Sequence, residues 1–367
     1  SNDNAALSAM QNGLGSGFEP FRTALETDGQ SELAARLLLE RGIYLSGEDP
    51  ELARVAVWQY IRSFPDHAEN ARAFIVLAEI ALRDIPPAPE KARNQLSKIE
   101  GMDALPGDLE KRDYLMMWVE SLAGSDNAAI ERGLEFLESW PQSSYEDDVR
   151  MKLGEMHFNT GDYVNARSQF VSLANTSESP TSKERALFFA GRSASLSLSE
   201  TSLDDALELF QQVVDGDGSL VIEARREQAS LLVRQAKIDG AVDLLDSVLA
   251  DKSTLSKREH LDVLLQKGEI LLANRPDDAA AIENAREAFE TMVKESEAEN
   301  DPSFSEVRAK GIYGLGRIAE AEGETDQALG HYYRILESAP TSTGANNAVV
   351  FWQFRSGMSA IDLLTKT

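Results

Sequence analysis

Residues 153–180 read LGEMHFNTGDYVNARSQFVSLANTSESP, and residues 315–340 read LGRIAEAEGETDQALGHYYRILESAP. Both stretches begin with Leu-Gly, carry a second Gly seven residues after the first, and place an Ala five residues after that second Gly. A large residue follows the Ala by four positions, and a Pro ends each stretch. This spacing predicts two successive helices whose backbones approach most closely at the first Gly and the Ala, because larger residues there would push the helices apart.

The turn between the two predicted helices has residues that can end the first helix and begin the second. Gly161 and Gly323 lie where a helix needs a C-terminal residue in the left-handed conformation. Asp162 and Thr325 are then the predicted N-caps of the second helices, because their side-chain oxygens can accept hydrogen bonds from free backbone N–H groups.

This pattern resembles the tetratricopeptide (TPR) repeat, whose signature is Leu-Gly and an aromatic residue on the first helix, then Ala, an aromatic residue, Ala and Pro on the second. Anchored on the small residue of the second helix, candidate repeats lie at Ala53, Ala92, Ala129, Ala166, Ala206, Ala241, Ala285 and Ala328. The intervals between these anchors average about 39 residues, which is longer than the 34 residues of the family. Four prolines follow an anchor by 12 to 14 residues, as a helix stop would require: Pro65, Pro141, Pro180 and Pro340.

The sequence therefore predicts an all-α fold, a right-handed TPR-like helical solenoid of about eight helix-pair repeats with a C-terminal capping helix. The pattern is weakest around Ala92, Ala129 and Ala241, where the first-helix Gly is missing. We expect three segments: a partly flexible N-terminal lead-in at residues 1–30, the repeat array at 31–343, and the capping helix at 344–367.

The apolar C-terminal segment has two interpretations. The last repeat of an array needs a cap, because its apolar face has no next neighbour to cover it. The segment from residue 344 onward is apolar enough to supply that cap. The alternative is that Phe351, Trp352 and Phe354 dock a partner or a second copy of the chain.

The chain is strongly acidic and has no cysteine. It carries 62 Asp and Glu against 36 Lys and Arg, a net charge of −26. That charge repels phosphate backbones, so we expect no nucleic-acid partner. The lack of Cys excludes disulfides, thiolate metal sites, iron–sulfur clusters and a Cys nucleophile. The longest uncharged stretch, residues 338–354, contains Pro and Gly and is shorter than the roughly 20 apolar residues of a bilayer span, so no membrane span is expected.

Residues suited to catalysis do not form a recognisable set in the sequence. The four histidines, His67, His157, His260 and His331, are scattered along the chain, and no G-K-[ST] motif marks a phosphate-binding loop. The TPR resemblance places His157 in a slot for a packed aromatic side chain. The sequence predicts no catalytic residue, no metal site and no cofactor, hence a protein that is not an enzyme. The alternative is an enzyme or ligand sensor whose site is assembled across repeats, which a deep pocket with buried ionisable groups would favour.

Two junctions between repeats have a narrower resemblance. Residues 63–71 read SFPDHAENA, and residues 139–148 read SWPQSSYEDD, followed by Leu-Gly-Glu at 153–155. They are similar to junctions in TPR proteins of the bacterial cell envelope, such as the outer-membrane-assembly lipoprotein of the barrel-insertion machinery and the periplasmic coordinator of the Tol-Pal system. The resemblance implies an extracytoplasmic location, in the periplasm or cell envelope of a bacterium, with the cytoplasm as the alternative.

In TPR arrays the first helices line a concave surface, and the resemblance assigns certain positions of each first helix to that surface. In this chain these positions collect arginine and aromatic residues: Arg185, Phe188, Arg192, Arg226, Arg234, Tyr313 and Arg317. Neighbouring guanidinium groups can fork onto carboxylates, so we expect a protein or peptide partner, and an acidic one in the favoured case. The alternative is that these arginines pair with glutamates of neighbouring helices, each pair contributing less than about 1 kcal/mol.

The function that follows is a non-enzymatic protein–protein interaction scaffold or adaptor. Its rival is a structural assembly component that uses its convex face and the C-terminal helix. The partner's identity and the oligomeric state do not follow from the sequence.

Overall fold

The computed structural model describes residues 32–197, 202–251, 255–299, 301–337 and 347–366. In these ranges every regular element is helical, with seventeen α-helices and one short 3-10 helix, and no strand occurs there. The predicted all-α class is therefore confirmed. The predicted N-terminal lead-in, residues 1–30, and the boundary between array and capping helix at 343–344 lie outside the described residues.

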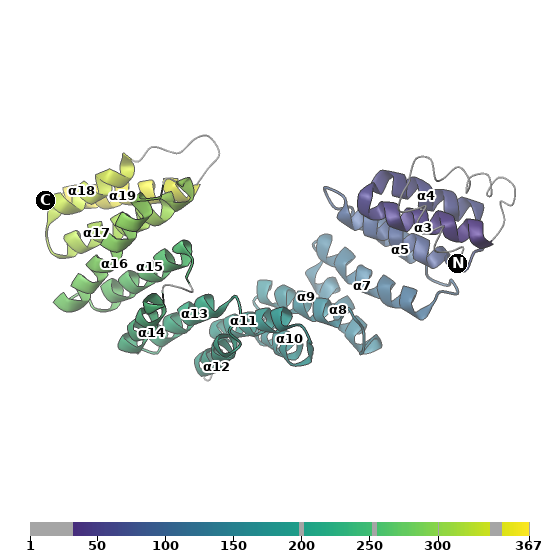
Figure 1. The fold of residues 1–367 in the computed structure, drawn as a ribbon, viewed down its shortest axis with the longest axis horizontal. Coiled ribbons are helices and arrows are strands. Elements are labelled where there is room, and N and C mark those ends of the chain that lie inside the picture. The colour runs from purple at the N-terminus through teal and green to yellow at the C-terminus, as the bar shows by residue number, and fades with distance from the viewer. Residues whose placement is uncertain (1–31, 198–201, 252–254, 300, 338–346, 367) are drawn as a thin grey trace. The chain divides into compact units, whose positions relative to one another are not determined.

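The chain divides into two compact units, residues 1–162 (unit 1) and 163–367 (unit 2), whose helices are labelled along the ribbon in Figure 1. The described helices of unit 1 are α3 (Glu32–Glu48), α4 (Pro50–Ser63), α5 (Asn70–Arg83), α6 (Pro89–Ser97), α7 (Pro106–Leu122), α8 (Asp126–Ser139) and α9 (Glu146–Asn159). Those of unit 2 are α10 (Tyr163–Thr176), α11 (Pro180–Leu196), α12 (Ser202–Asp215), α13 (Val221–Arg234), α14 (Ile238–Ala250), α15 (Lys257–Asn274), α16 (Ala279–Glu297), η1 (Pro302–Phe304), α17 (Ser305–Ala321), α18 (Thr325–Leu336) and α19 (Asn347–Lys366).

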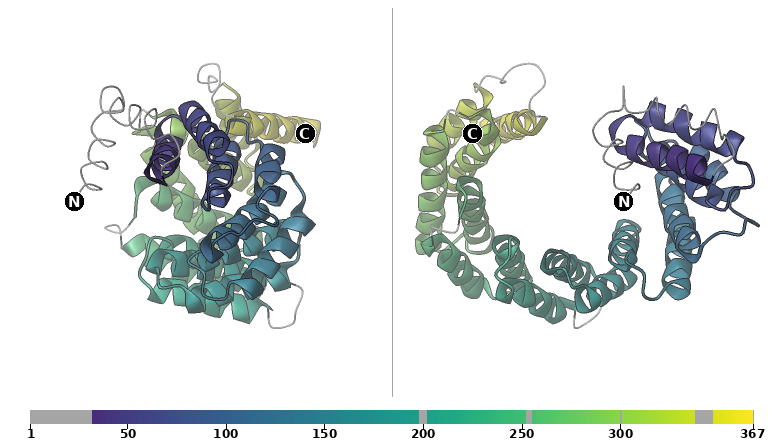
Figure 2. Two further views of the ribbon diagram at one scale, coloured as in Figure 1. Left: turned by 90° about the vertical axis from the view of Figure 1, so that its right-hand side faces the viewer. Right: turned by 45° about the vertical axis from the view of Figure 1, so that its right-hand side comes forward.

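Packing within each unit is local along the chain. Every substantial contact joins helices that are one or two positions apart in chain order, such as α11 with α12 and α15 with α17. Both views of Figure 2 show consecutive helices of unit 2 lying side by side. This is the arrangement of a repeat array, in which each repeat contacts only its neighbours.

The predicted anchor alanines all lie on the second helix of a pair. They are fully buried, each with 0% of its surface exposed, and they lie on α4, α6, α8, α10, α12, α14, α16 and α18: Ala53, Ala92, Ala129, Ala166, Ala206, Ala241, Ala285 and Ala328. The three anchors with the weakest sequence pattern are buried as completely as the others. A small residue at this position is therefore the feature that all the pairs share.

Glycines on the first helices let aromatic rings from the second helices approach closely. The ring in question comes four residues after the anchor alanine, as in Ala285 and Phe289. A Cβ atom added to the glycine would lie under 3.0 Å from that ring in three pairs: Gly191 with Phe210 at 2.9 Å, Gly268 with Phe289 at 2.7 Å, and Gly316 with Tyr332 at 2.6 Å. The glycine and the ring thus interlock as a knob and a hole, and this contact sets the spacing between the two helices.

The turns between helices follow the prediction at the glycines but not at one cap. Gly161 and Gly323 both have φ of +80°, the left-handed conformation expected at a helix C-terminus. Asp162 immediately precedes α10, as predicted. The prediction of Thr325 as an N-cap is wrong, because α18 begins at Thr325 itself and its N-cap residue is Glu324, which makes no side-chain capping bond.

Helix α19 packs against α18 and α17 (Figure 1). Its packed face includes Val349, Ser356, Ala360 and Leu363, each less than 9% exposed. Ala360 and Leu363 belong to the same hydrophobic core as Tyr332. The segment predicted to cap the array therefore covers the end of the α17–α18 pair.

Candidate functional site

The seven residues predicted to bind a partner all lie on first helices of unit 2. Helix α11 carries Arg185, Phe188 and Arg192, α13 carries Arg226 and Arg234, and α17 carries Tyr313 and Arg317. Seven residues separate Arg185 from Arg192, so these two side chains lie two turns apart on one face of α11. The register derived from the repeat thus places arginines on the adjacent first helices α11 and α13.

Three of these arginines bridge neighbouring first helices. Arg192 Nε lies 3.9 Å from Glu227 Oε1 on α13, and both side chains are more than one third exposed. Arg234 donates to the backbone carbonyl of Ser195 at 2.6 Å. Arg226 Nε donates to Gln266 Oε1 on α15 at 3.1 Å.

The acceptors of Arg226 and Arg234 are neutral groups. Gln266 Nε2 donates in return to the Arg226 carbonyl at 2.8 Å, so these residues form a closed pair between α13 and α15. An amide and a backbone carbonyl orient a guanidinium without cancelling its charge. The arginines therefore link neighbouring helices. Of these three, Arg192 has the glutamate partner considered from the sequence, and Arg226 and Arg234 keep an uncancelled positive charge.

Arg185 and Arg317 are exposed, and neither side chain has a hydrogen bond or ion pair with any described residue. The charge of Arg317 acts on Glu269 of α15. Loss of hydration raises the pKa of the Glu269 carboxyl, while the charges of Lys310, Arg317 and Arg355 oppose that rise. Cations from α17 and α19 thus surround one carboxylate on α15.

The two aromatic residues of the predicted set are packed side chains. Phe188 is half-buried, and its ring contacts Phe210 at 5.6 Å between centroids. Tyr313 is only 9% exposed. Its hydroxyl lies 3.1 Å from Ser359 Oγ, and its ring centroid lies 5.3 Å from that of Trp352. Helix α19 therefore covers Tyr313.

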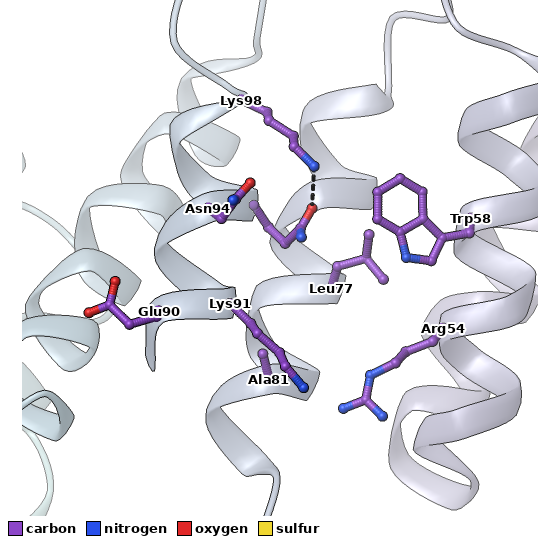
Figure 3. A pocket seen from close by; sticks show the side chains of 9 residues that line it. Arg54, Trp58, Leu77, Ala81, Glu90, Lys91, Asn94 and Lys98 are labelled. Carbon is purple, nitrogen blue, oxygen red and sulfur yellow. Dashed lines mark hydrogen bonds between the residues drawn. The ribbon is translucent and has the colours of Figure 1, made fainter. Parts of the chain in front are cut away.

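A pocket of about 550 Å³ in unit 1 was not predicted from the sequence. Figure 3 shows Arg54 and Trp58 on α4, Leu77 and Ala81 on α5, and a polar row along α6. That row consists of Glu90, Lys91, Asn94, Gln95 and Lys98. The pocket thus combines an aromatic wall, an apolar floor and basic groups.

The basic groups of this pocket differ in whether they already pair with other side chains of the protein. Arg54 pairs with Asp84 and Glu51. Lys98 donates to Gln95 Oε1 at 3.0 Å and lies 5.0 Å from the ring centroid of Trp58. The side chain of Lys91 is exposed and has no hydrogen bond or ion pair with a described residue. A carboxylate next to an apolar group fits this combination, because Lys91 can pair with the charge while Trp58 packs against the apolar part. The lysines at 91 and 98, seven residues apart on one helical face, are the only sequence signal for it.

The histidines lie on different parts of the chain, and three of them, His67, His157 and His260, contact nearby side chains. His67 Nδ1 lies 2.8 Å from the Tyr60 hydroxyl, and His260 Nε2 lies 3.5 Å from Glu295. His157 is buried, as the TPR resemblance implies, with Nδ1 3.2 Å from Asp162. No group of three or more His, Asp or Glu side chains in the described ranges is arranged to hold a metal ion. None of the described helices is both long and apolar enough to cross a membrane.

Comparisons with known proteins identify a repeat family and several similar folds. A family model described as a tetratricopeptide repeat matches residues 311–342. No curated protein matches the sequence. Among solved structures, a Signal Transduction ATPase with Numerous Domains from Pyrococcus horikoshii, which has a tetratricopeptide repeat sensor, is 11% identical, with a TM-score of 0.50. The match covers 93% of this chain and 51% of that one, so this chain spans about half of that protein.

Two further structures are similar at lower scores. A tetratricopeptide repeat protein from Parabacteroides merdae is 15% identical over 76% of this chain and 98% of its own, with a TM-score of 0.42. YrrB, described as a TPR protein with an unusual peptide-binding site, is 17% identical over 54% of this chain and 92% of its own, with a TM-score of 0.41. Residues 311–342 thus match the tetratricopeptide repeat, and they lie within an all-helical fold of the TPR solenoid type.

Proposed function

We propose that the protein is a non-enzymatic interaction scaffold that binds an acidic peptide or protein segment across first helices α11 and α13 of unit 2. A TPR-type fold supports a role in protein–protein interaction in general. The observation that supports an acidic partner is the set of four arginines on this face, because Arg226 and Arg234 are bound to neutral acceptors and Arg185 is exposed without a partner.

The binding chemistry follows from these contacts. The Arg192–Glu227 pair is long and exposed, so a partner carboxylate can replace Glu227 at little cost. Arg226 is already oriented by Gln266, so less side-chain entropy is lost when a carboxylate binds it. The net charge of −26 slows the approach of an acidic ligand, so binding depends on short-range geometry.

The test compares the Arg192→Ala/Arg226→Ala double variant with Arg132→Ala, an exposed arginine on α8 of unit 1. An array of acidic peptides is probed with each chain at low and at moderate salt. We expect some peptides to bind the wild-type chain and Arg132→Ala equally, to lose at least about tenfold in affinity to the double variant, and to bind more weakly as salt rises. Peptides that bind the double variant as tightly as the wild-type chain would rule out the α11–α13 site.

The unit 1 pocket is a second candidate site for the same class of ligand. Its support is Lys91, whose side chain has no hydrogen bond or ion pair with a described residue and extends toward the Arg54 side of the pocket (Figure 3). In the same array, Lys91→Glu is expected to reduce binding of peptides that combine a carboxylate with an aromatic residue. The control is Lys294→Glu, at an exposed lysine on α16 that lies outside both proposed sites. Equal binding to both variants would exclude the pocket.

The proposed setting is the envelope of a bacterium, outside the cytoplasm. Its support is the similarity of the junctions at 63–71 and 139–148 to those of envelope TPR proteins. Fractionation of the source cells, with immunodetection of the natural protein, tests this. We expect the protein in the periplasmic or membrane fraction, and recovery with the cytoplasmic enzymes would contradict the proposal.

A further inference from the structure

Helix α19 is apolar on the face that unit 2 leaves uncovered, as well as on the face that packs. Four exposed residues form a row along it, which we call the α19 stripe: Val350 (54% exposed), Phe354 (69%), Ile361 (55%) and Leu364 (52%). A helix that is hydrophobic all round is normally buried on all sides. An exposed apolar row of this kind is therefore expected to be covered by another helix.

The stripe is centred on Gly357. Its members lie seven and three residues before this glycine and four and seven residues after it, which places all of them on one helical face. Gly357 is the eleventh residue of α19, and Gly191, Gly268 and Gly316 are each the twelfth residue of α11, α15 and α17. Gly357 thus lies within one residue of the helix position that the three glycines receiving a ring from a second helix occupy.

The ring is missing at Gly357. At the other three glycines an added Cβ would lie between 2.6 and 2.9 Å from an aromatic side chain of the following helix. At Gly357 the same atom would meet Leu336 Cδ2 of α18 at 3.6 Å and nothing else in the described neighbouring structure within 4 Å. Helix α19 also packs against α18 and α17 as α17 packs against α16 and α15. Its position is that of a first helix, and no second helix among the described residues packs on its other side.

We propose that the α19 stripe is a docking site for a partner helix that carries a small residue and, four residues later, an aromatic ring that packs onto Gly357. The spacing of a buried Ala and a ring four residues later occurs four times within unit 2, at Ala166–Phe170, Ala206–Phe210, Ala285–Phe289 and Ala328–Tyr332, and in the last three the ring packs onto a first-helix glycine. Charge allows the contact, because Arg355 and Asp362 are the only ionisable residues from 347 to 364 in a chain of net charge −26. This docking surface is separate from the α11–α13 arginines, so either proposal can fail without the other.

The test uses the full 367-residue chain and a blocked synthetic peptide with the sequence of residues 162–176, DYVNARSQFVSLANT. This peptide contains Ala166 and Phe170 and has no net charge, because Asp162 and Arg167 cancel. Its binding is measured by fluorescence anisotropy, and the Phe170→Ala peptide is the matched control. We expect the wild-type chain to bind the first peptide at least about tenfold more tightly than the control peptide.

Variants of the chain locate the contact. Gly357→Leu fills the position of the ring, and Phe354→Lys places a charge in the stripe, and each is expected to weaken binding about tenfold or more. Val55→Lys changes an equally exposed apolar residue on α4 and is expected to bind as the wild-type chain does. Circular dichroism checks that each variant keeps its helices. Few atoms surround Gly357, so we expect Gly357→Leu to fold as the wild-type chain does.

Three results would overturn the proposal. The first is no binding of either peptide, and the second is equal binding to Gly357→Leu and to the wild-type chain. The third is a dimer of the chain alone that Phe354→Lys converts to monomer in light scattering, because the occupant of the stripe would then be a second copy.

Discussion

A Cβ atom added to Gly316 would lie 2.6 Å from the Tyr332 ring, whereas one added to Gly357 would meet only Leu336, at 3.6 Å. The same substitution, Gly→Ala, should therefore change the free energy of unfolding in opposite directions at these two positions. Gly316→Ala overpacks the α17–α18 contact and should lower the free energy of unfolding by about 1–3 kcal/mol. Gly357→Ala should raise it by about 0.5–1 kcal/mol, because alanine favours the helix over glycine. Urea unfolding of both variants measures the two differences. Equal changes of the same sign would mean that the ring at Gly316 does not set the helix spacing.

The second prediction at this scale concerns His331. Burial lowers its pKa, and the nearby positive charges of Arg334 and Arg286 lower it further. The unfolded chain then takes up a proton before the folded chain as pH falls below about 6.5, so the stability that neutral His331 contributes is present above that pH and is lost below it. Unfolding in urea between pH 5 and 8 should show this loss in the wild-type chain. His331→Gln should flatten the profile in that range, and an unchanged slope would contradict this role.

At the scale of single helices, the N-terminus of α15 allows the contribution of a capping box to stability to be tested. Ser256 accepts from the Glu259 backbone N–H, and the Glu259 side chain accepts from the Ser256 backbone N–H, so the two form a capping box. Ser256→Ala should destabilise the protein by about 0.5–2 kcal/mol. Ser247→Ala removes an exposed hydroxyl bonded to a backbone carbonyl within α14 and should have little effect. Thermal unfolding of the two variants compares them, and an equal loss would leave the capping box without a measurable role.

Some features of the helices could be predicted from the sequence and others could not, depending on the interaction that determines each one. The anchors at Ala92, Ala129 and Ala241 are buried even though their first-helix glycine is absent, because a small residue on the second helix is enough for close packing. The cap at Thr325 was wrong by one residue, because the helix start depends on backbone geometry after Gly323, which the spacing of residues does not specify.

The candidate site was predictable only in part, for a similar reason. Register alone placed Arg192 and Arg226 on adjacent first helices, since spacing within a repeat determines the helical face. It did not identify Gln266 as the partner of Arg226, because the two residues are 40 positions apart and meet only through packing. The unit 1 pocket was missed for the same reason, since its walls come from three helices without a shared motif.

At the scale of the molecule, the charges are arranged to serve local contacts. Many arginines bind carboxylates on a neighbouring helix pair, such as Arg167 with Asp205 at 2.7 Å and Arg275 with Asp239 at 2.7 Å. Exposed pairs of this kind each add little stability. The excess of acidic residues therefore acts mainly on solubility and on the approach of other charged molecules.

The confinement of contacts to helices one or two positions apart has a mechanical consequence. When such a chain is stretched from its two ends, no substantial contact between described helices more than two positions apart shares the load, so the outermost helix pair of each unit can detach while the pairs behind it stay folded. In an optical trap the force–extension curve should show several small steps, each releasing roughly 40 residues of length, which is the spacing of one repeat. A single release of the whole contour length would mean that the helix pairs fail together. A chain that lengthens pair by pair under tension can keep its remaining surfaces folded and able to bind.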